Sequence, residues 1–527
     1  MRQKLYNMIR WILFFSCLCL LVVKGNGQSV TVKSAAEDLL SAEQLADSSL
    51  ADYSFCVRPL QNTGQIAAAL QKEDFNYFAP PLVSSRLFKI NLLPVSWTQQ
   101  FNSHHPFGWN DGVMIPAKGY QTMITAGVYA KVGPLSVQLQ PELVYAANPQ
   151  FETTTDYGSP TTGKYQKIFA GQSSIRLTQG GFSVGVSTEN LWWGPGIHSS
   201  LIMSNNAPGF AHLTFNSSHP VKTAIGSFEW QLIGGKLSFD KNLPSQNFNL
   251  RPAFSTPAAM TAHAADWRYL SGLSIAWQPK WLKGLFLGMN RIFQVYNKDL
   301  KANSAGFTDK YFPVFNVLQK QNAGSEDSKN RDQIVSLFTK WVLPKAQAEV
   351  YAEYGWNDYS YNIRDFVMSP THSAAYLAGF RKIVNLPGKK LLEIGTEITH
   401  MEQSTDYVVR NAGNWYEHGI ITEGYTHDNQ IMGAGSGMGN NVLTITTTLI
   451  NGWKSIGLEL ERIENDPLSI NHASRWTDYA VGFTGQCNYQ RFLFSVRLQG
   501  IQSANYGWEL NKNLFNFHGV VGVSYLW

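Results

Sequence analysis

The sequence predicts an all-β protein: a transmembrane antiparallel β-barrel of about 18 strands, preceded by a short N-terminal periplasmic segment with helical character. Three observations predict this fold class. Apolar and polar residues alternate with a period of two beyond residue 85, short turns alternate with long loops, and the last strand ends on an aromatic residue. All three features are typical of outer-membrane barrels.

Residues 1–27 are predicted to form a secretory signal peptide. Lys4 and Arg10 make a positive region before an apolar run from Trp11 to Val23, which is too short to span a bilayer and has the length of a signal core. Small residues then suit cleavage before Gln28. An uncleaved anchor and a lipoprotein anchored at Cys17 are the alternatives, and the second conflicts with the apolar residues that follow Cys17.

The composition does not have the excess of basic residues that is typical of nucleic-acid-binding proteins. Cleavage lowers the net charge from +5 to +1, because the removed segment holds four basic residues and no acidic one (Arg2, Lys4, Arg10 and Lys24). Only 15% of the residues are charged, against about 25% in soluble domains. This balance suits a surface that faces lipid. Two cysteines remain after cleavage, Cys56 and Cys487, and the sequence leaves their pairing open.

Residues 28–85 are predicted to form a separate periplasmic segment. The stretches 35–45 and 64–72 are rich in Ala, Leu, Glu and Gln, which favour helix, and two prolines at 80–81 end this part of the chain. A disordered leader is the alternative. The barrel is then expected over residues 86–527.

The strands are predicted from side chains that alternate between two faces. In the stretch 391–399, Ile394 and Ile398 share one face while Glu393 and Glu397 share the other. Because a membrane barrel is apolar outside and polar inside, the isoleucines are expected to face lipid and the glutamates the lumen. The same pattern assigns five residues to a candidate lumenal network: Arg176, Arg491, Arg497, Glu393 and Glu397.

The strand count follows from the lengths of the connections. Eight short turns, among them Gly133-Pro134, Gly234-Gly235 and Asn451-Gly452, alternate with nine longer loops. Eight hairpins, with a first strand near 87–100 and a last one near 517–527, give about 18 strands. In bacterial barrels the short turns are periplasmic and the long loops extracellular.

The last strand predicts insertion into the outer membrane. Phe517, Val521, Tyr525 and Trp527 share one face, and the chain ends on the last of these rings. An apolar stripe that ends in interfacial rings suits the lipid boundary, and it is similar to the terminal signal read by the outer-membrane assembly machinery. The predicted partners therefore include outer-membrane lipid and that machinery.

The sequence predicts no enzyme, no cofactor and no metal site. No HExxH motif is present, and the glycine-rich stretch 433–439 matches neither a phosphate loop nor a nucleophile elbow, so we interpret it as a flexible surface loop. The pair His104-His105 is a weak metal candidate, because neighbours on a strand point to opposite faces.

One long loop, 188–213, carries candidate glycan-binding residues: Trp192, Trp193, Asn205 and Asn206. Aromatic rings stack on the apolar faces of sugars, and amides bond to their hydroxyls. The alternative is that the tryptophans pack the loop into the mouth of the barrel.

Six stretches of the chain carry a resemblance to a known family: NLWWGPG (190–196), LIMSNNAPG (201–209), HPFGWNDG (105–112), IPAKGYQ (115–121), GPLSVQLQPELVYAAN (133–148) and EHGIITEGYTHDNQIMGAGSG (417–437). Together they span most of residues 87–527 and resemble the Wzi-type outer-membrane capsule assembly proteins, in particular their Bacteroidetes members. The resemblance implies an eighteen-stranded barrel, with helices on its periplasmic side, that binds capsular polysaccharide at the cell surface.

The predicted function is therefore that of a non-enzymatic outer-membrane protein that attaches or organises capsular or other extracellular polysaccharide. A general porin is the first alternative, and an open lumen would favour it. An outer-membrane enzyme that acts on lipid or glycan is the second. A Ser or Asp nucleophile beside a His at the rim would favour the enzyme, and the sequence contains no such spacing.

Overall fold

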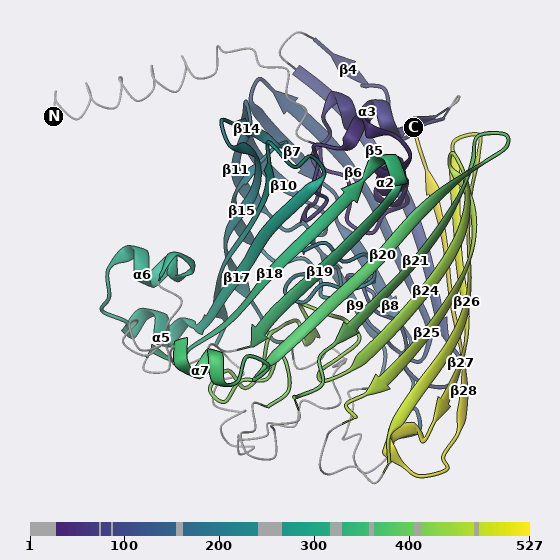
Figure 1. Cartoon of the computed structure of the whole chain (residues 1–527). Helices are drawn as coiled ribbons and strands as arrows, with labels where there is room; N and C mark the ends of the chain where they lie inside the picture. The colour runs from purple at the N-terminus through teal and green to yellow at the C-terminus, as the bar shows by residue number, and fades with distance from the viewer. Residues whose placement is uncertain are drawn as a thin grey trace.

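A computed structural model of the chain describes most of the residues after the predicted signal peptide, which itself lies outside the described part. The strands form one closed antiparallel sheet, in which β28 (Leu514–Tyr525) pairs with β5 (Phe88–Asn102) (Figure 1). Among the described residues, no helix is long and apolar enough to cross a membrane. The described ranges are 28–72, 75–85, 88–153, 162–240, 266–316, 329–357, 363–404, 413–467 and 474–527.

The closed sheet confirms the predicted barrel of 18 strands. Of its 22 named segments, β4 (Val83–Ser84) only lengthens one edge, and three pairs of segments are each one interrupted strand: β7 with β8, β9 with β10, and β13 with β14. After β5 the segments are β6 (Gly119–Val132), β7 (Leu135–Leu139), β8 (Glu142–Ala146), β9 (Tyr165–Phe169), β10 (Ser174–Gln179), β11 (Phe182–Ser187), β13 (His212–Ser217), β14 (Val221–Thr223), β15 (Gly226–Leu237), β16 (Arg268–Pro279), β17 (Leu285–Tyr296), β18 (Arg331–Leu343), β19 (Ala348–Asn357), β20 (Ala374–Leu386), β21 (Lys390–His400), β24 (Asn441–Asn451), β25 (Lys454–Asn465), β26 (Trp476–Tyr489) and β27 (Phe492–Ala504).

The predicted alternation of faces is confirmed along the wall. In β21 the outward Ile394 and Ile398 are each about 40% exposed, while the inward Glu397 is 2% exposed. In β25 the outward Leu458 is 61% exposed. The outer face is thus an apolar belt, and the inner face carries the polar side chains, as lipid outside requires.

One predicted turn is wrong. Gly234 and Gly235 lie within β15, and the hairpin turn falls at residues 224–225, between β14 and β15. A Cβ atom at Gly235 would lie 2.6 Å from the ring of Phe210. The glycine therefore makes room for a ring that packs inside the barrel, rather than reversing the chain.

The segment before the barrel sits at the short-turn end, beside the C-terminus (Figure 1). The helices expected there are confirmed as α2 (Ala35–Ala46) and α3 (Gly64–Leu70). Their buried apolar side chains form one core with Trp453, Leu493 and Leu526 of the barrel, so this segment closes that end. The short elements here are η1 (Ser48–Leu50), β1 (Val57–Arg58), β2 (Gln71–Lys72) and β3 (Phe75–Asn76). Cys56 and Cys487 are both free.

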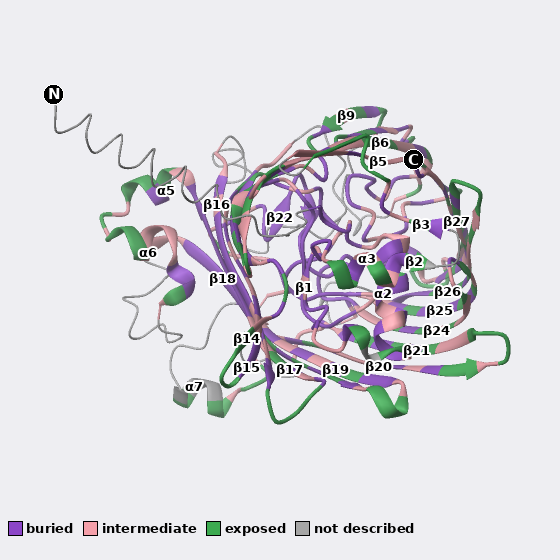
Figure 2. Ribbon diagram, turned by 90° about the horizontal axis from the view of Figure 1, so that it is seen from above, coloured by how far each residue is buried: buried purple, intermediate pink, exposed green. Residues whose placement is uncertain are grey.

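Long loops fill the interior. Seen along the barrel, β1 and the loop strand β22 (Thr426–His427) lie inside the ring of strands (Figure 2). The loop 188–211 contributes β12 (Trp192–Trp193), which pairs with β1 in the lumen. Residues of this loop and of the loop 413–440 form a buried apolar cluster with the wall. The other loop elements are β23 (Gln430–Ile431), α5 (Asn297–Ala302), α6 (Phe307–Tyr311), η2 (Pro313–Phe315), η4 (Pro344–Ala346), α7 (Ile363–Met368) and η6 (Tyr506–Trp508).

Leu458→Arg is expected to lower the free energy of unfolding by about 2–4 kcal/mol, because it puts a charge near the middle of the apolar belt. The matched control is Thr448→Arg, which puts the same charge on the inner face beside the lumen cavity, opposite Glu393 on the neighbouring strand. The measurement is denaturant unfolding of the barrel folded into phospholipid vesicles. Equal costs for the two variants would contradict the assignment of the faces.

Candidate functional site

The predicted tryptophans are inside the barrel. Trp192 and Trp193 are both 0% exposed. Trp193 donates through Nε1 to Oε1 of Gln231 on the wall (2.8 Å), and the guanidinium of Arg58 lies 4.7 Å from the ring centre of Trp192. Neither ring has a free face, so neither can stack on a sugar in this structure. The two rings instead hold the loop in the lumen, which is the alternative weighed above.

The predicted asparagines connect loops. Nδ2 of Asn205 donates to the carbonyl of Asn110 (2.9 Å), and Nδ2 of Asn206 donates to the carbonyl of Ile431 (2.8 Å). Asn206 is 2% exposed, and its Oδ1 accepts from the backbone N–H of Asn110 (3.2 Å). The two amides thus fix the relative positions of three loops, and they are not directed at an open surface.

Two of the predicted lumenal arginines form short ion pairs. Arg176 contacts Glu189 at 2.5 Å, with both side chains at most 2% exposed. Arg497, on β27, contacts Glu459 of β25 at 2.5 Å. Each guanidinium has a carboxylate partner, so these pairs neutralise charge inside the barrel.

The two predicted lumenal glutamates also face inward. Glu393 is 3.4 Å from Arg381 on the neighbouring strand. Glu397 accepts hydrogen bonds from the backbone N–H groups of Ile197 (2.7 Å) and His198 (3.1 Å). Glu397 therefore holds the tip of the loop 188–211 against the wall. Both residues therefore make contacts that stabilise the interior of the barrel.

The assignment of Arg491 to the lumen is wrong. Arg491 lies in the tight turn between β26 and β27 and is exposed, with Nη1 3.4 Å from the hydroxyl of Tyr525. The alternation of faces was extended one residue too far at this strand end. At a turn the chain reverses, so side-chain direction no longer follows the period of two.

A polar cavity of about 390 Å³ lies in the lumen, between α2, the loop tips and the wall formed by β20 to β27. Its basic groups include Arg58, Arg381 and Arg497, each within 4 Å of a carboxylate. Asp111 also lines the cavity. Burial raises the pKa of Asp111 to about 6, although the nearby Arg497 and Lys33 oppose the shift.

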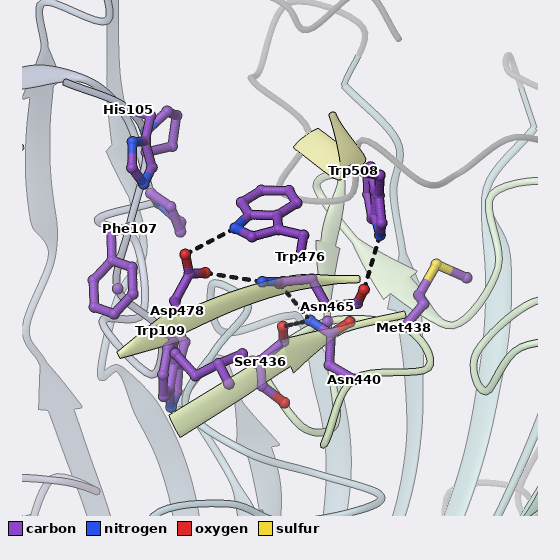
Figure 3. A pocket seen from close by; sticks show the side chains of 16 residues that line it. His105, Phe107, Trp109, Ser436, Met438, Asn440, Asn465, Trp476, Asp478 and Trp508 are labelled. Carbon is purple, nitrogen blue, oxygen red and sulfur yellow. Dashed lines mark hydrogen bonds between the residues drawn. The ribbon is translucent and has the colours of Figure 1, made fainter. Parts of the chain in front are cut away.

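A second pocket, of about 100 Å³, opens at the long-loop end (Figure 3). We call it the mouth pocket. Four segments that are distant in sequence line it: the loop 105–116, the glycine-rich stretch 435–440, the adjoining ends of β25 and β26, and η6. Its side chains are mainly aromatic rings and amides: His105, Phe107, Trp109, Trp476, Trp508, Asn440 and Asn465.

The aromatic side of the mouth pocket is rigid. Trp476 and Trp508 meet edge to face with ring centres 5.0 Å apart, and Nε1 of Trp508 donates to the carbonyl of Asn465 (2.9 Å). Trp109 is half-buried, and its ring centre lies 5.6 Å from that of Phe107. Trp109 also lines the lumen cavity.

The polar side of the mouth pocket centres on Asp478. Its carboxylate accepts from Nε1 of Trp476 (2.8 Å) and from Nδ2 of Asn465 (2.9 Å) (Figure 3). Asn440 donates to Oδ1 of Asn465 (3.3 Å) and to the carbonyl of Ser436. The amides and the carboxylate thus hold one another in fixed orientations, which favours selective hydrogen bonding to a ligand.

His105 has unsatisfied polar atoms in the pocket wall. It is 1% exposed, and neither ring nitrogen has a hydrogen-bond partner among the described residues. Burial, with smaller contributions from His104 and Lys118, lowers its pKa to about 3. The ring is therefore neutral near pH 7, with one nitrogen that donates and one that accepts.

The barrel wall positions these loops. Nδ2 of Asn102, on β5, donates to the carbonyl of Phe107 (2.9 Å), and Nδ2 of Asn516, on β28, donates to the carbonyl of His105 (3.1 Å). Across the pocket, a Cβ atom at Gly435 would lie 2.3 Å from Oδ1 of Asn206 and 2.7 Å from Cβ of Trp109. Only glycine at 435 allows these loops to meet.

The mouth pocket was not predicted from the sequence. The prediction that the stretch 433–439 is a flexible surface loop is wrong, because all but one of these residues are buried. Two of the stretches that carry the family resemblance, 105–112 and 417–437, could have indicated this pocket. They meet in the structure at Trp109 and Gly435.

The family described as capsule assembly protein Wzi matches residues 110–507. The chain belongs to this family. The comparison with curated protein sequences gives no match.

The solved structure of Wzi from Escherichia coli is 15% identical to this Wzi-family chain, covers 95% of it and 99% of its own length, and has a TM-score of 0.61. At this identity the likeness shows the fold, a Wzi-type outer-membrane barrel. The outer membrane protein OprD from Pseudomonas aeruginosa is 6% identical, with 82% of this chain and 92% of that one covered and a TM-score of 0.40.

Proposed function

We propose that this Wzi-family protein binds capsular or other extracellular polysaccharide at the cell surface, through the mouth pocket and without catalysis. The observation that carries the proposal is a rigid pocket of rings and amides at the long-loop end, with the unpartnered His105 in its wall. Rings and oriented amides are the groups that bind sugars. The solved Escherichia coli relative, described as a carbohydrate-binding β-barrel involved in group 1 capsule assembly, supports it.

The proposal includes an orientation in the outer membrane. The long loops and the mouth pocket face the outside of the cell, and residues 28–85 close the periplasmic end. Residues 1–27 are removed as a signal peptide, and the assembly machinery inserts residues 86–527 as a barrel in outer-membrane lipid. The difference in length between the turns at one end and the loops at the other supports this topology.

A general porin is disfavoured by the filled interior. The loop residues Leu201, Ile202 and Met203 are at most 2% exposed in the centre of the barrel. Porins need a continuous aqueous channel. In this barrel, buried side chains of two loops and of the wall form an apolar cluster in the lumen instead.

Trp109→Ala is expected to weaken polysaccharide binding about 3- to 10-fold, because a stacked ring contributes about 0.5–1.5 kcal/mol. Trp109 is half-buried, so its loss should disturb the fold less than loss of Trp476 or Trp508. The measurements are cell-associated against shed polysaccharide in intact cells, and binding by the purified barrel.

The matched control is Trp281→Ala. Trp281 is 67% exposed and lies in the turn after β16, at the opposite end of the barrel. This variant should retain polysaccharide like the wild type, with both proteins present at equal abundance. Normal retention by Trp109→Ala would remove the mouth pocket from the binding site.

A further inference from the structure

We infer that the mouth pocket takes an uncharged sugar residue and discriminates against acidic ones such as uronic acids. This inference rests on the proposed function and names the class of ligand for the same site. It is carried by the charges and hydrogen-bonding groups of the pocket wall, which suit hydroxyls and lack a partner for a carboxylate.

No lysine or arginine is among the described residues that line the mouth pocket, and its one formally charged side chain is the carboxylate of Asp478. Proteins usually recognise carboxylates with arginine or lysine, and arginine binds them through two parallel hydrogen bonds. A uronic acid here would place a second carboxylate near Asp478 in a largely enclosed space. Repulsion between the carboxylates of the uronic acid and Asp478 at such short range would weaken binding.

The basic residues around the pocket do not change this balance. Lys512 contacts the carboxylates of Glu152 (2.8 Å) and Glu509 (3.2 Å), so its charge is already compensated. Lys118 acts on the titration of His105, yet it does not line the pocket. The paired arginines of the lumen line the other cavity.

The hydrogen-bonding groups match a sugar hydroxyl. A hydroxyl both donates and accepts, and the half-buried amide of Asn465 in the pocket wall carries one group of each kind. Asp478 accepts only, so a hydroxyl proton suits it and an anionic oxygen does not. With about 100 Å³ of space, the pocket takes part of one sugar residue, and the rest of that residue and of the chain lies outside.

The test compares matched ligands on the purified barrel. The probes are methyl glycosides of glucose, galactose and mannose, each beside the methyl glycoside of the corresponding uronic acid, measured by ligand-observed NMR at low salt. We expect at least one neutral glycoside to bind, and its uronate to bind at least about tenfold more weakly. Raising the salt concentration should narrow the difference.

Asp478→Asn removes the charge with little change in shape and is expected to bring the uronate within about threefold of the neutral glycoside. Asp52→Asn is the matched control, because Asp52 is a half-exposed carboxylate in the segment at the other end of the barrel. It should leave the ratio unchanged. Heat-modifiable mobility on gels reports whether each variant is folded.

The outcomes separate the two proposals. If none of these glycosides binds, the pocket is no glycan site, and the proposed function fails there together with the inference. If a uronate binds as well as its neutral counterpart or better, the inference is overturned while the proposed function stands. An unchanged ratio in folded Asp478→Asn would also overturn it, because the discrimination would then have another source.

Discussion

Replacing residues 188–211 with a two-residue turn is expected to convert a closed barrel into a conducting one. Ser187 and His212 are direct partners in the ladder between β11 and β13, so the two ends of this loop are already adjacent. An Asn-Gly turn can join two antiparallel strands at such a point. The barrel wall then keeps its strand order and its register.

The expected conductance follows from what the loop occupies. Its residues 191–210 supply seven of the 23 residues in the buried cluster inside the barrel, and the carbonyl of Leu201 accepts from the hydroxyl of Tyr416 in the second filling loop (2.8 Å). Removal of the first loop also removes β12, the partner of β1. Water would fill the vacated space and connect it with the lumen cavity.

The measurement is single-channel current across a planar bilayer. The wild type should give no steady current steps, and the loop-replacement variant should give them. The control replaces residues 358–372, a loop that carries the exposed α7 between β19 and β20, and it should stay silent like the wild type. Porin-like currents from the wild type would contradict the sealed interior and revive the porin alternative.

The wall of the barrel was predictable because its signal is local. A strand shows its two faces in successive residues, so Ile394 and Glu397 could be assigned without any knowledge of their neighbours. The pairing of the last strand with the first followed from closure alone. The turn at Gly235 was predicted wrongly because this glycine makes room for Phe210, which is distant in sequence. The lumenal assignment of Arg491 was wrong because the strand has already ended there.

The mouth pocket was not predictable in this way. Its parts come from residues near 109, 440, 476 and 508, and only closure of the sheet brings them together. Trp192 and Trp193 offered a stronger local pattern, but aromatic pairs serve as well in a core as on a binding surface. Neither the amino-acid types nor their spacing in the sequence shows which aromatic rings stay accessible to a ligand.

The buried carboxylate of Glu189 attaches the loop 188–211 to the barrel wall. Glu189, which follows β11, accepts from Nη2 of Arg176 (2.5 Å) and from the hydroxyl of Ser187 (2.7 Å). The hydroxyl of Ser29 also donates to it, so one carboxylate joins the wall, the loop and the segment before the barrel. Arg176 and Glu189 are at most 2% exposed.

Glu189→Ala is expected to lower the free energy of unfolding by about 3–5 kcal/mol, because it leaves the guanidinium of Arg176 buried without its partner. Glu464→Ala is the matched control. Its carboxylate is also 2.5 Å from an arginine, Arg462, but that arginine side chain is 47% exposed. An exposed pair of this kind contributes at most about 1 kcal/mol. The two variants therefore differ in burial and not in contact distance.

The measurement combines denaturant unfolding with hydrogen exchange of the loop 188–211, which should exchange faster in Glu189→Ala. The double variant Arg176→Met, Glu189→Met should recover much of the lost stability, because it removes both charges and leaves apolar side chains in their place. Recovery would show that the cost of the single variant comes from the uncompensated arginine. If the double variant is as unstable as Glu189→Ala, the hydrogen bonds from Ser29 and Ser187 hold the loop, and the ion pair does not.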